Sequence, residues 1–370
     1  MEAVVKAVEQ AIDADMPESF GLVLDGWSPG TEHYLAVYGC YETDAGPRYP
    51  LLSLAPGIED ADDQMNAEGH LRAFARFLPF FGKSMSGCKF LVGDSCAGNK
   101  RLANLIGVPL VGCASHRLNL AVRDYLAPFD SEMEEVQQLM RKLRTLKQAT
   151  KLRTKTELLP VLWQDTRWSS TFAMLKRFFR LREFISADDE DLADCMPSRT
   201  AHRKLASLLD NLRDVESVSK RLQADELTLL DARDLCDGLI EIRPLFAKYL
   251  GNSEGAWWPS SNTVIGGRRW GPRAVQALFR QRAVAQPQPE ATEGFAERIL
   301  KRRKVRDAPV AYTLLGAIPP TSNTVERLFS VARAVLRHER HRLSPMMLEM
   351  ILFLKTNSTF WNVATVEQCL

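Results

Sequence analysis

Long hydrophobic runs are missing from this sequence. None of its apolar stretches reaches the roughly 18 residues that a membrane-spanning helix needs, and the N-terminus lacks the apolar segment of a secretory signal. The seven cysteines are odd in number and show no short repeated spacing. This pattern argues against a disulfide scaffold and fits a reducing compartment. We therefore expect a soluble intracellular protein.

Paired zinc ligands are also scarce. Cys113 and His116 form one Cys-x-x-His pair, but no second Cys/His pair with suitable spacing follows. Because a structural zinc ion typically takes four ligands in two close pairs, the sequence disfavours a zinc site here.

The net charge of +2 conceals an uneven distribution of sign. Residues 1–70 contain 14 acidic side chains against two basic ones, whereas residues 141–182 contain 12 Lys and Arg against two acids. Two further basic clusters lie at 300–306 and 333–342. Segregated positive charge indicates a polyanionic partner, although any single cluster could equally be a solvated helix face.

Strand and helix patterns alternate in the first third of the chain. Strand-like runs cover 20–25, 33–41, 48–55, 88–95 and 108–113. Helical patterns cover 1–15, 67–81, a short segment after Ala97, and 115–126. Three strands followed by alternating helices and strands predict a mixed α/β layer.

Helical periodicity dominates from about 131 to 310. Gly- and Pro-rich interruptions at 251–262 and 284–294 predict loops or partly disordered segments. Two strongly apolar helices follow at 321–336 and 344–357. Because the last helix is too apolar for solvent, it must pack on the core or on a second subunit.

Two carboxylates follow predicted buried strands. Asp25 ends the run 20–25, and Asp94 ends a second strand in the same way. In an open sheet, groups just beyond the strand ends line the functional crevice. Mg²⁺ takes oxygen ligands, and two such ions can bracket a phosphodiester. The alternative is that Asp25-Gly26 and Asp94-Ser95 simply open turns.

The C-terminal stretch 321–357 resembles the dimerisation region of hAT-superfamily transposases. The matching residues are Glu326, Arg327, Phe329, Ser330, Arg342, Leu343, Leu352 to Leu354 and Asn357. Four further segments match in order, namely "LVLDGW" (22–27), "FLVGDSCAGN" (90–99), "GCASHRLNLAV" (112–122) and "DTRWSSTFAMLKR" (165–177). Each motif alone is weak, but the ordered set runs from about residue 18 to 357.

The resemblance implies an RNase H-like mixed sheet flanked by helices and interrupted by an all-α insertion. The first part of this core would be 1–130, the insertion 131–310 with flexible loops at about 251–294, and the part completing the core 311–370. The residues implied to act as catalytic metal ligands are Asp25, Asp94 and Glu326.

The implied activity is DNA cleavage and strand transfer with Mg²⁺ or Mn²⁺ at a two-metal site. The implied partners are DNA, as transposon ends or target, and further copies of the chain joined through 321–357. The implied location is the nucleus.

Glu326 also has a local interpretation. Asn323-x-x-Glu326 resembles a capping box, in which the glutamate reaches back to the N-cap amide. The resemblance favours the metal ligand over this cap.

Several residues are expected to contact DNA. Within the resemblance, Trp168 lies in the insertion and stabilises a flipped base, while the Cys113–His116 segment is structural and places His116 near the crevice. The alternative is that Trp168 anchors the insertion to the sheet. The full set of expected DNA contacts is His116, Arg167, Trp168, Lys176, Arg177 and Arg337.

One departure from the family leaves a second function open. The cysteines and histidines offer no BED-type zinc finger of the kind that reads transposon ends. A truncated copy, a fragment or a host-adopted derivative is therefore expected. The alternative function is a catalytically inactive, domesticated nuclear protein that acts by dimerisation and DNA binding. A nuclease for RNA–DNA hybrids is disfavoured, because it would not need the apolar C-terminal helices.

Overall fold

The structure is a computed structural model of the 370-residue chain. The residues it describes are 1–29, 32–56, 66–164, 168–186, 189–193, 195–224, 227–251, 263–265, 268–270, 294–304, 318–336 and 343–370.

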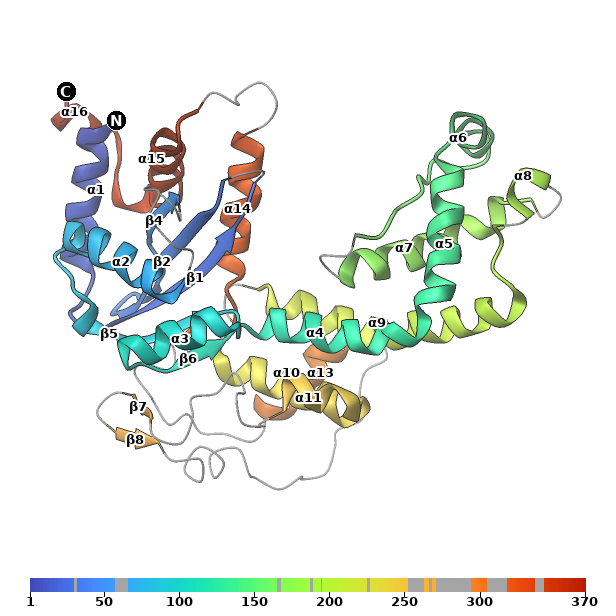
Figure 1. Ribbon diagram of the computed structural model, residues 1–370, viewed down its shortest axis with the longest axis horizontal. Coiled ribbons are helices and arrows are strands. Elements are labelled where there is room, and N and C mark those ends of the chain that lie inside the picture. Colours follow the sequence, from blue (N-terminus) through green and yellow to red (C-terminus); the bar gives the residue numbers. More distant parts are fainter. Residues whose placement is uncertain are drawn as a thin grey trace.

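A mixed six-stranded sheet forms the centre of the α/β part (Figure 1). Its strands are β1 (Phe20–Trp27), β2 (Tyr34–Thr43), β3 (Gly46–Arg48), β4 (Leu51–Pro56), β5 (Cys88–Gly93) and β6 (Leu110–Gly112). Their order is β3-β2-β1-β5-β6, and β4 also pairs with β2. β1 is antiparallel to β2 and parallel to β5, which is parallel to β6. The predicted RNase H-like α/β fold class is confirmed.

The two central strands are apolar because both of their faces are covered. Leu22 and Leu24 of β1 and Leu91 of β5 are all at most 1% exposed. Gly21 is required between these strands, since a Cβ atom there would lie 2.2 Å from the ring of Phe90. The sheet core therefore depends on close approach of β1 and β5.

Helices follow the strands largely as predicted. The first ones are α1 (Glu2–Asp15), α2 (Ala67–Phe77), α3 (Ala97–Ile106) and α4 (Ala114–Leu126), with 3₁₀ turns η1 (Leu78–Phe81), η2 (Met85–Gly87) and η3 (Ala127–Phe129). The helix expected over 67–81 is α-helical only to Phe77. Pro79 lies in the first turn of the 3₁₀ segment, where its missing N–H cannot continue an α-helix.

A group of helices projects away from the sheet (Figure 1). They are α5 (Asp130–Leu143), α6 (Leu146–Arg153), α7 (Trp168–Leu181), η4 (Arg182–Phe184) and α8 (Glu190–Ala193). The elements α9 (Arg199–Leu222), α10 (Leu229–Ile242), η5 (Pro244–Phe246), α11 (Ala247–Leu250) and α13 (Phe295–Lys304) complete the helical region. None of the helices within the described ranges is long and apolar enough to cross a membrane.

The predicted loops about 251–294 fall mostly outside the described residues. The exceptions are Gly251, Gly294 and a small hairpin of β7 (Thr263–Ile265) and β8 (Arg268–Trp270).

The end of the chain returns to the sheet. Its elements are α14 (Asn323–Val335), α15 (Pro345–Thr356), η7 (Ser358–Phe360) and α16 (Val363–Gln368). α14 packs on β1 and β2, and α15 packs on β4 and α1. The sequence predicts that the apolar final helix packs either on the core or on a second subunit. One face of α15 packs on the core, where Leu352 is fully buried. Met346 on the same helix is 65% exposed.

The side chain of Asn357 binds the backbone of β4. It is 1% exposed, and it accepts a hydrogen bond from Leu51 N at 3.0 Å and donates one to Leu51 O at 2.8 Å. Glu349 of α15 likewise accepts from Leu54 N at 3.0 Å. Among the described strands, β4 pairs with β2 alone, so these contacts of α15 protect the free side of an edge strand.

We expect Asn357→Ala to lower the free energy of unfolding by about 1–3 kcal/mol, because both backbone groups of Leu51 would be left buried without a partner. Thermal and urea unfolding would measure the change. Asn104→Ala is the control, since Asn104 is exposed on α3. Equal stability of the two variants would contradict this role.

Candidate active site

Asp25 and Asp94 lie next to each other where the C-terminal ends of β1 and β5 meet. We call this side of the sheet the acidic edge. The parallel register pairs Val23 with Val92, and its continuation by two residues sets Asp25 beside Asp94. Asp25 lies within β1, paired with Ala36 of β2, so the strand continues past the predicted end. The turn interpretation of Asp25 is therefore wrong.

Helix α14 brings Glu326 to the same place. The rings of Trp27 and Phe329 stack with centroids 5.6 Å apart. Asp25 shares a strand face with Trp27, and Glu326 precedes Phe329 by about one helical turn on the same side of α14. The stack therefore sets Glu326 near Asp25, and the charge of Glu326 helps to raise the pKa of Asp25.

Asn323 is not at the N-cap position that the capping alternative for Glu326 requires. α14 begins at Asn323, and its N-cap, Ser322, makes no side-chain cap hydrogen bond. The side-chain amide of Asn323 instead donates to Leu222 O at 3.0 Å. Glu326 is half-buried on the first turn of the helix.

His116 contacts Asp94 directly. Its Nδ1 lies 3.0 Å from Asp94 Oδ2, and the two side chains are 35% and 29% exposed. This hydrogen bond, opposed by burial and reinforced by the charges of Asp94, Asp25 and Glu326, raises the pKa of His116. Asn99 holds the backbone of the same aspartate by donating to Asp94 O at 2.9 Å.

Burial and like charge both act on Asp25. Burial is the main cause that raises the pKa of its carboxyl to about 7, and repulsion by Asp94 and Glu326 adds to it. The amide of Gly26, which donates to Asp25 Oδ1 at 2.8 Å, acts in the opposite direction. Ionisation of Asp25 is therefore unfavourable beside these two acids.

A divalent cation would relieve this repulsion. Three carboxylates are the oxygen donors that Mg²⁺ and Mn²⁺ prefer. In the part of the chain that the structure describes, however, no three His, Cys, Asp or Glu side chains are grouped closely enough to hold a metal ion. The donors fit the chemistry of the predicted metal, and they would have to move closer together to share it.

Cys113 connects the first and last parts of this site. Its sulfur accepts a hydrogen bond from Ser322 N at 3.4 Å, and Ala114 N donates to Pro320 O at 3.0 Å. Burial, with the nearby charge of Asp94, raises the pKa of the Cys113 thiol to about 11. Cys113 is thus a neutral structural group, in keeping with the interpretation of its motif.

Trp168 is buried at the start of α7. It is 7% exposed, and its ring packs edge-on against Phe172 with centroids 6.2 Å apart. Its backbone N–H donates to Asn119 Oδ1 of α4 at 3.2 Å. These contacts favour the anchoring alternative over a base-stacking role for Trp168.

The predicted DNA contacts on α7 lie apart from the acidic edge, where Asp25, Asp94 and Glu326 meet. Arg167 and Arg337 lie outside the described residues. Lys176 is exposed and Arg177 donates to Leu159 O at 2.6 Å, both on α7. Figure 1 shows α7 among the helices that project away from the sheet, whereas His116 contacts one of the carboxylates directly.

Part of the basic cluster 141–182 is already neutralised. Lys147 Nζ lies 2.6 Å from Asp191 Oδ2, and Lys151 Nζ lies 2.7 Å from Asp189 Oδ2. The exposed cations of this cluster whose side chains form no ion pair or hydrogen bond with another described residue are Lys142, Arg144, Arg153, Lys176, Arg180 and Arg182. Fewer cations of this cluster are therefore available to a polyanion than the sequence indicates.

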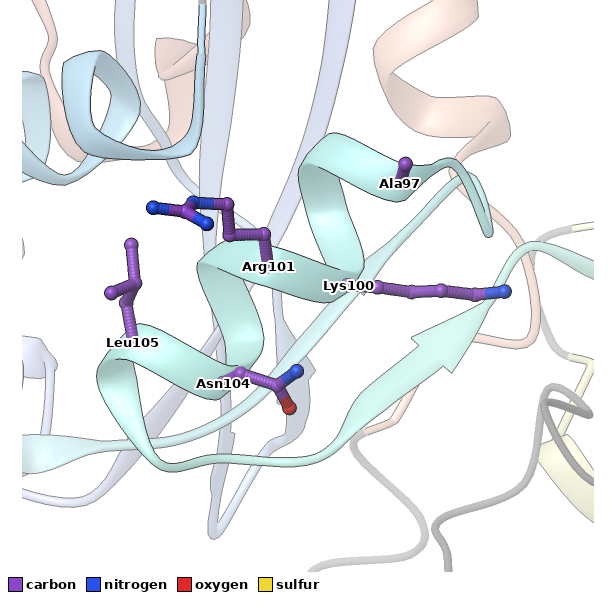
Figure 2. Close-up of a pocket in the computed structure, with 5 residues that line it drawn as sticks. All are labelled: Ala97, Lys100, Arg101, Asn104 and Leu105. Carbon is purple, nitrogen blue, oxygen red and sulfur yellow. The ribbon is translucent and has the colours of Figure 1, made fainter.

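Sequence reasoning missed two cations that lie close in the sequence to Asp94 and His116. Lys100 lies on α3, which begins three residues after Asp94, and it lines a pocket on that helix with Asn104 (Figure 2). In Figure 2, Arg101 extends to the other side of the helix, where it pairs with Glu68. Arg117, next to His116, donates to Tyr249 O at 2.9 Å. Only the closeness in sequence of Lys100 and Arg117 to Asp94 and His116 could have indicated them.

Comparison with known proteins finds one family model. The ZBED1 RNase-like helical domain matches residues 111–210, from β6 into α9. No curated protein matches the chain. Over this segment the chain is similar to a helical domain of hAT-related proteins, in keeping with its RNase H-like sheet.

The raised pKa of Asp25 predicts that Asp25→Asn stabilises the metal-free protein by an amount that depends on pH. Below pH about 4 the aspartate is protonated in both states, so the variant gains nothing. Between that pH and about 7 the unfolded chain ionises first, and wild-type stability falls. We expect the melting temperature of the variant to exceed that of the wild type by an amount that grows up to about pH 7. Above that pH the difference should stay constant. A difference independent of pH would contradict the prediction.

Proposed function

We propose that this protein is a transposase-like enzyme that cleaves DNA phosphodiesters and transfers strands with Mg²⁺ or Mn²⁺. The observation that carries the proposal is that Asp94 and Glu326 lie near Asp25 at one edge of an RNase H-like sheet and repel its carboxylate. Such repulsion is maintained at functional sites more often than in structural cores. The helical domain matched at 111–210 adds the hAT-related context.

Each group at the edge has a distinct task in this proposal. Asp25, Asp94 and Glu326 would hold the cations, which when bound stabilise the attacking and leaving oxygens of the phosphodiester. His116 orients Asp94 through its 3.0 Å contact, and Asn99 fixes the backbone of that aspartate. The Gly26 amide orients one oxygen of Asp25.

The proposed substrate, DNA, is a polyanion that exposed cations can bind. Lys100 lies close in sequence to Asp94, and Lys176 and Arg180 are four residues apart on the exposed side of α7. Contacts between Lys or Arg and phosphates position the duplex without reading its sequence. A nuclear location and self-association through 321–357 belong to the same proposal.

A second function has its own observation. His116 already engages one oxygen of Asp94, and the described acidic residues form no ready metal site. A domesticated, catalytically inactive nuclear protein that dimerises and binds DNA would keep this arrangement. The two functions differ in whether the cation binds at the acidic edge.

We expect Asp94→Asn to abolish Mg²⁺- or Mn²⁺-dependent nicking of DNA, because it removes a charged ligand from the centre of the site. Gel assays of nicking and strand transfer on plasmid DNA would measure the activity, and fluorescence anisotropy would check that DNA binding persists.

The matched control is Asp210→Asn, since the side chain of Asp210 is 68% exposed on α9. It should cleave like the wild type. DNA binding by the wild type without any metal-dependent cleavage would instead favour the inactive alternative.

The exposed cations Lys176 and Arg180 of α7 predict a selective decrease in DNA affinity when they are removed. The double variant Lys176→Ala/Arg180→Ala should bind DNA more weakly, because it removes two positive charges that can pair with phosphates. The negative slope of log K against log salt should become less steep by about 0.9 for each phosphate that the variant no longer neutralises.

The control for this decrease is Lys147→Ala/Lys151→Ala, which also removes two cations four residues apart. Because Lys147 and Lys151 are paired with Asp191 and Asp189, their removal should change affinity and slope less. An equal effect of both double variants would show that the ion pairs do not mask these lysines.

A further inference from the structure

We propose that Asn323 is a positioning residue. Its side chain binds the first turn of α14, and with it Glu326, to the C-terminal end of α9 through a hydrogen bond that we call the latch. The placement of a catalytic carboxylate would then depend on the helical region. The catalytic consequence rests on the proposed function, whereas the latch itself does not.

The end of α9 leaves one carbonyl for Asn323. The last four carbonyls of any α-helix have no partner within the helix. In α9, Ser219 O accepts from Gln223 Nε2 at 3.2 Å, Lys220 O from Gln223 N at 3.2 Å, and Arg221 O from Ala224 N at 3.0 Å. Leu222 O accepts from Asn323 Nδ2 at 3.0 Å, a buried bond between groups 101 residues apart. Helix α9 is therefore completed by α14.

A second donor follows one turn later on α14. Arg327 donates through Nη2 to Gln223 O at 2.8 Å. Asn323 and Arg327 are four residues apart, so they lie on the same side of their helix. A cation is also favourable at the negative end of the α9 dipole. Both donors thus bind adjacent carbonyls at the end of α9.

Glu326 lies between these two donors in the sequence. Asn323 is 6% exposed, and it is separated from Glu326 by one turn of a continuous helix. The same helix is held from the other side by the stack of Trp27 on Phe329. The Asn323 bond therefore fixes the end of α14 from which the Glu326 carboxylate projects.

Helix α9 extends this dependence into the helical region. Its 24 residues span about 36 Å at 1.5 Å per residue. It starts at a Ser198 cap and packs along its length against α7 and α13 (Figure 1). A nucleic acid bound to the exposed side of α7 would thus act on a helix whose other end binds Asn323, one turn from Glu326.

The test uses Asn323→Ala and Asn323→Asp in the full chain. The aspartate keeps the size of the side chain but cannot donate to Leu222 O. Isothermal titration with Mn²⁺ should show about tenfold weaker binding for both variants, as for removal of a group that orients a metal ligand. Hydrogen exchange should become faster in 219–223 and 323–327 together, because the bond joins these two turns.

The control is Ala332→Gly, which weakens the same helix without touching the latch. The positioning role would be overturned if the Asn323 variants lost no more Mn²⁺ affinity than this control. Unchanged exchange in 219–223 would overturn the latch itself. If wild-type protein shows no Asp94-dependent Mn²⁺ binding, the proposed function fails, and the exchange result then decides the latch alone.

Discussion

The packing of α14 against β1 is the constraint on which the candidate site depends. The stack of Trp27 on Phe329 joins the first strand of the sheet to a helix about 300 residues later in the chain. Asp25 lies two residues before one ring and Glu326 three residues before the other, so a single apolar contact sets both carboxylates at one edge. Parallel pairing of β1 with β5 adds Asp94. Apolar packing thus holds together groups that repel one another.

This repulsion gives the edge its chemical character. The carboxyl of Asp25 has a pKa raised to about 7, chiefly by burial, beside two further acids and a histidine whose own pKa is raised. Hydrogen bonds from the Gly26 amide and from His116 offset part of the unfavourable charge without removing it. Stability alone would favour neutral side chains at these positions, and the proposed cation would give a reason for acids instead.

The strands and most helices of the α/β part could be predicted because their apolar periodicity is local. The carboxylates of the site could be predicted because β1 and β5 each place an acid at the end of a buried run. Side chains whose partners lie far away in sequence could not. Asn323 has the spacing of a cap, yet it binds Leu222 of another helix. Lys147 and Lys151 look like free cations in the sequence, yet acids some 40 residues later neutralise them. Trp168 had two open interpretations, and its burial favours the anchoring one.

The sequence by itself determined the α/β class, the strands that carry Asp25 and Asp94, and the motif that carries Glu326, because short-range patterns of burial and charge specify them. Only the tertiary structure decided that His116 binds Asp94, that β1 runs through Asp25 to Trp27, and that α9 ends on α14. The physical reason is that a hydrogen bond or a stacked pair needs two partners within a few ångströms. Folding brings such partners together from distant parts of the chain, and no local pattern records which group each will meet.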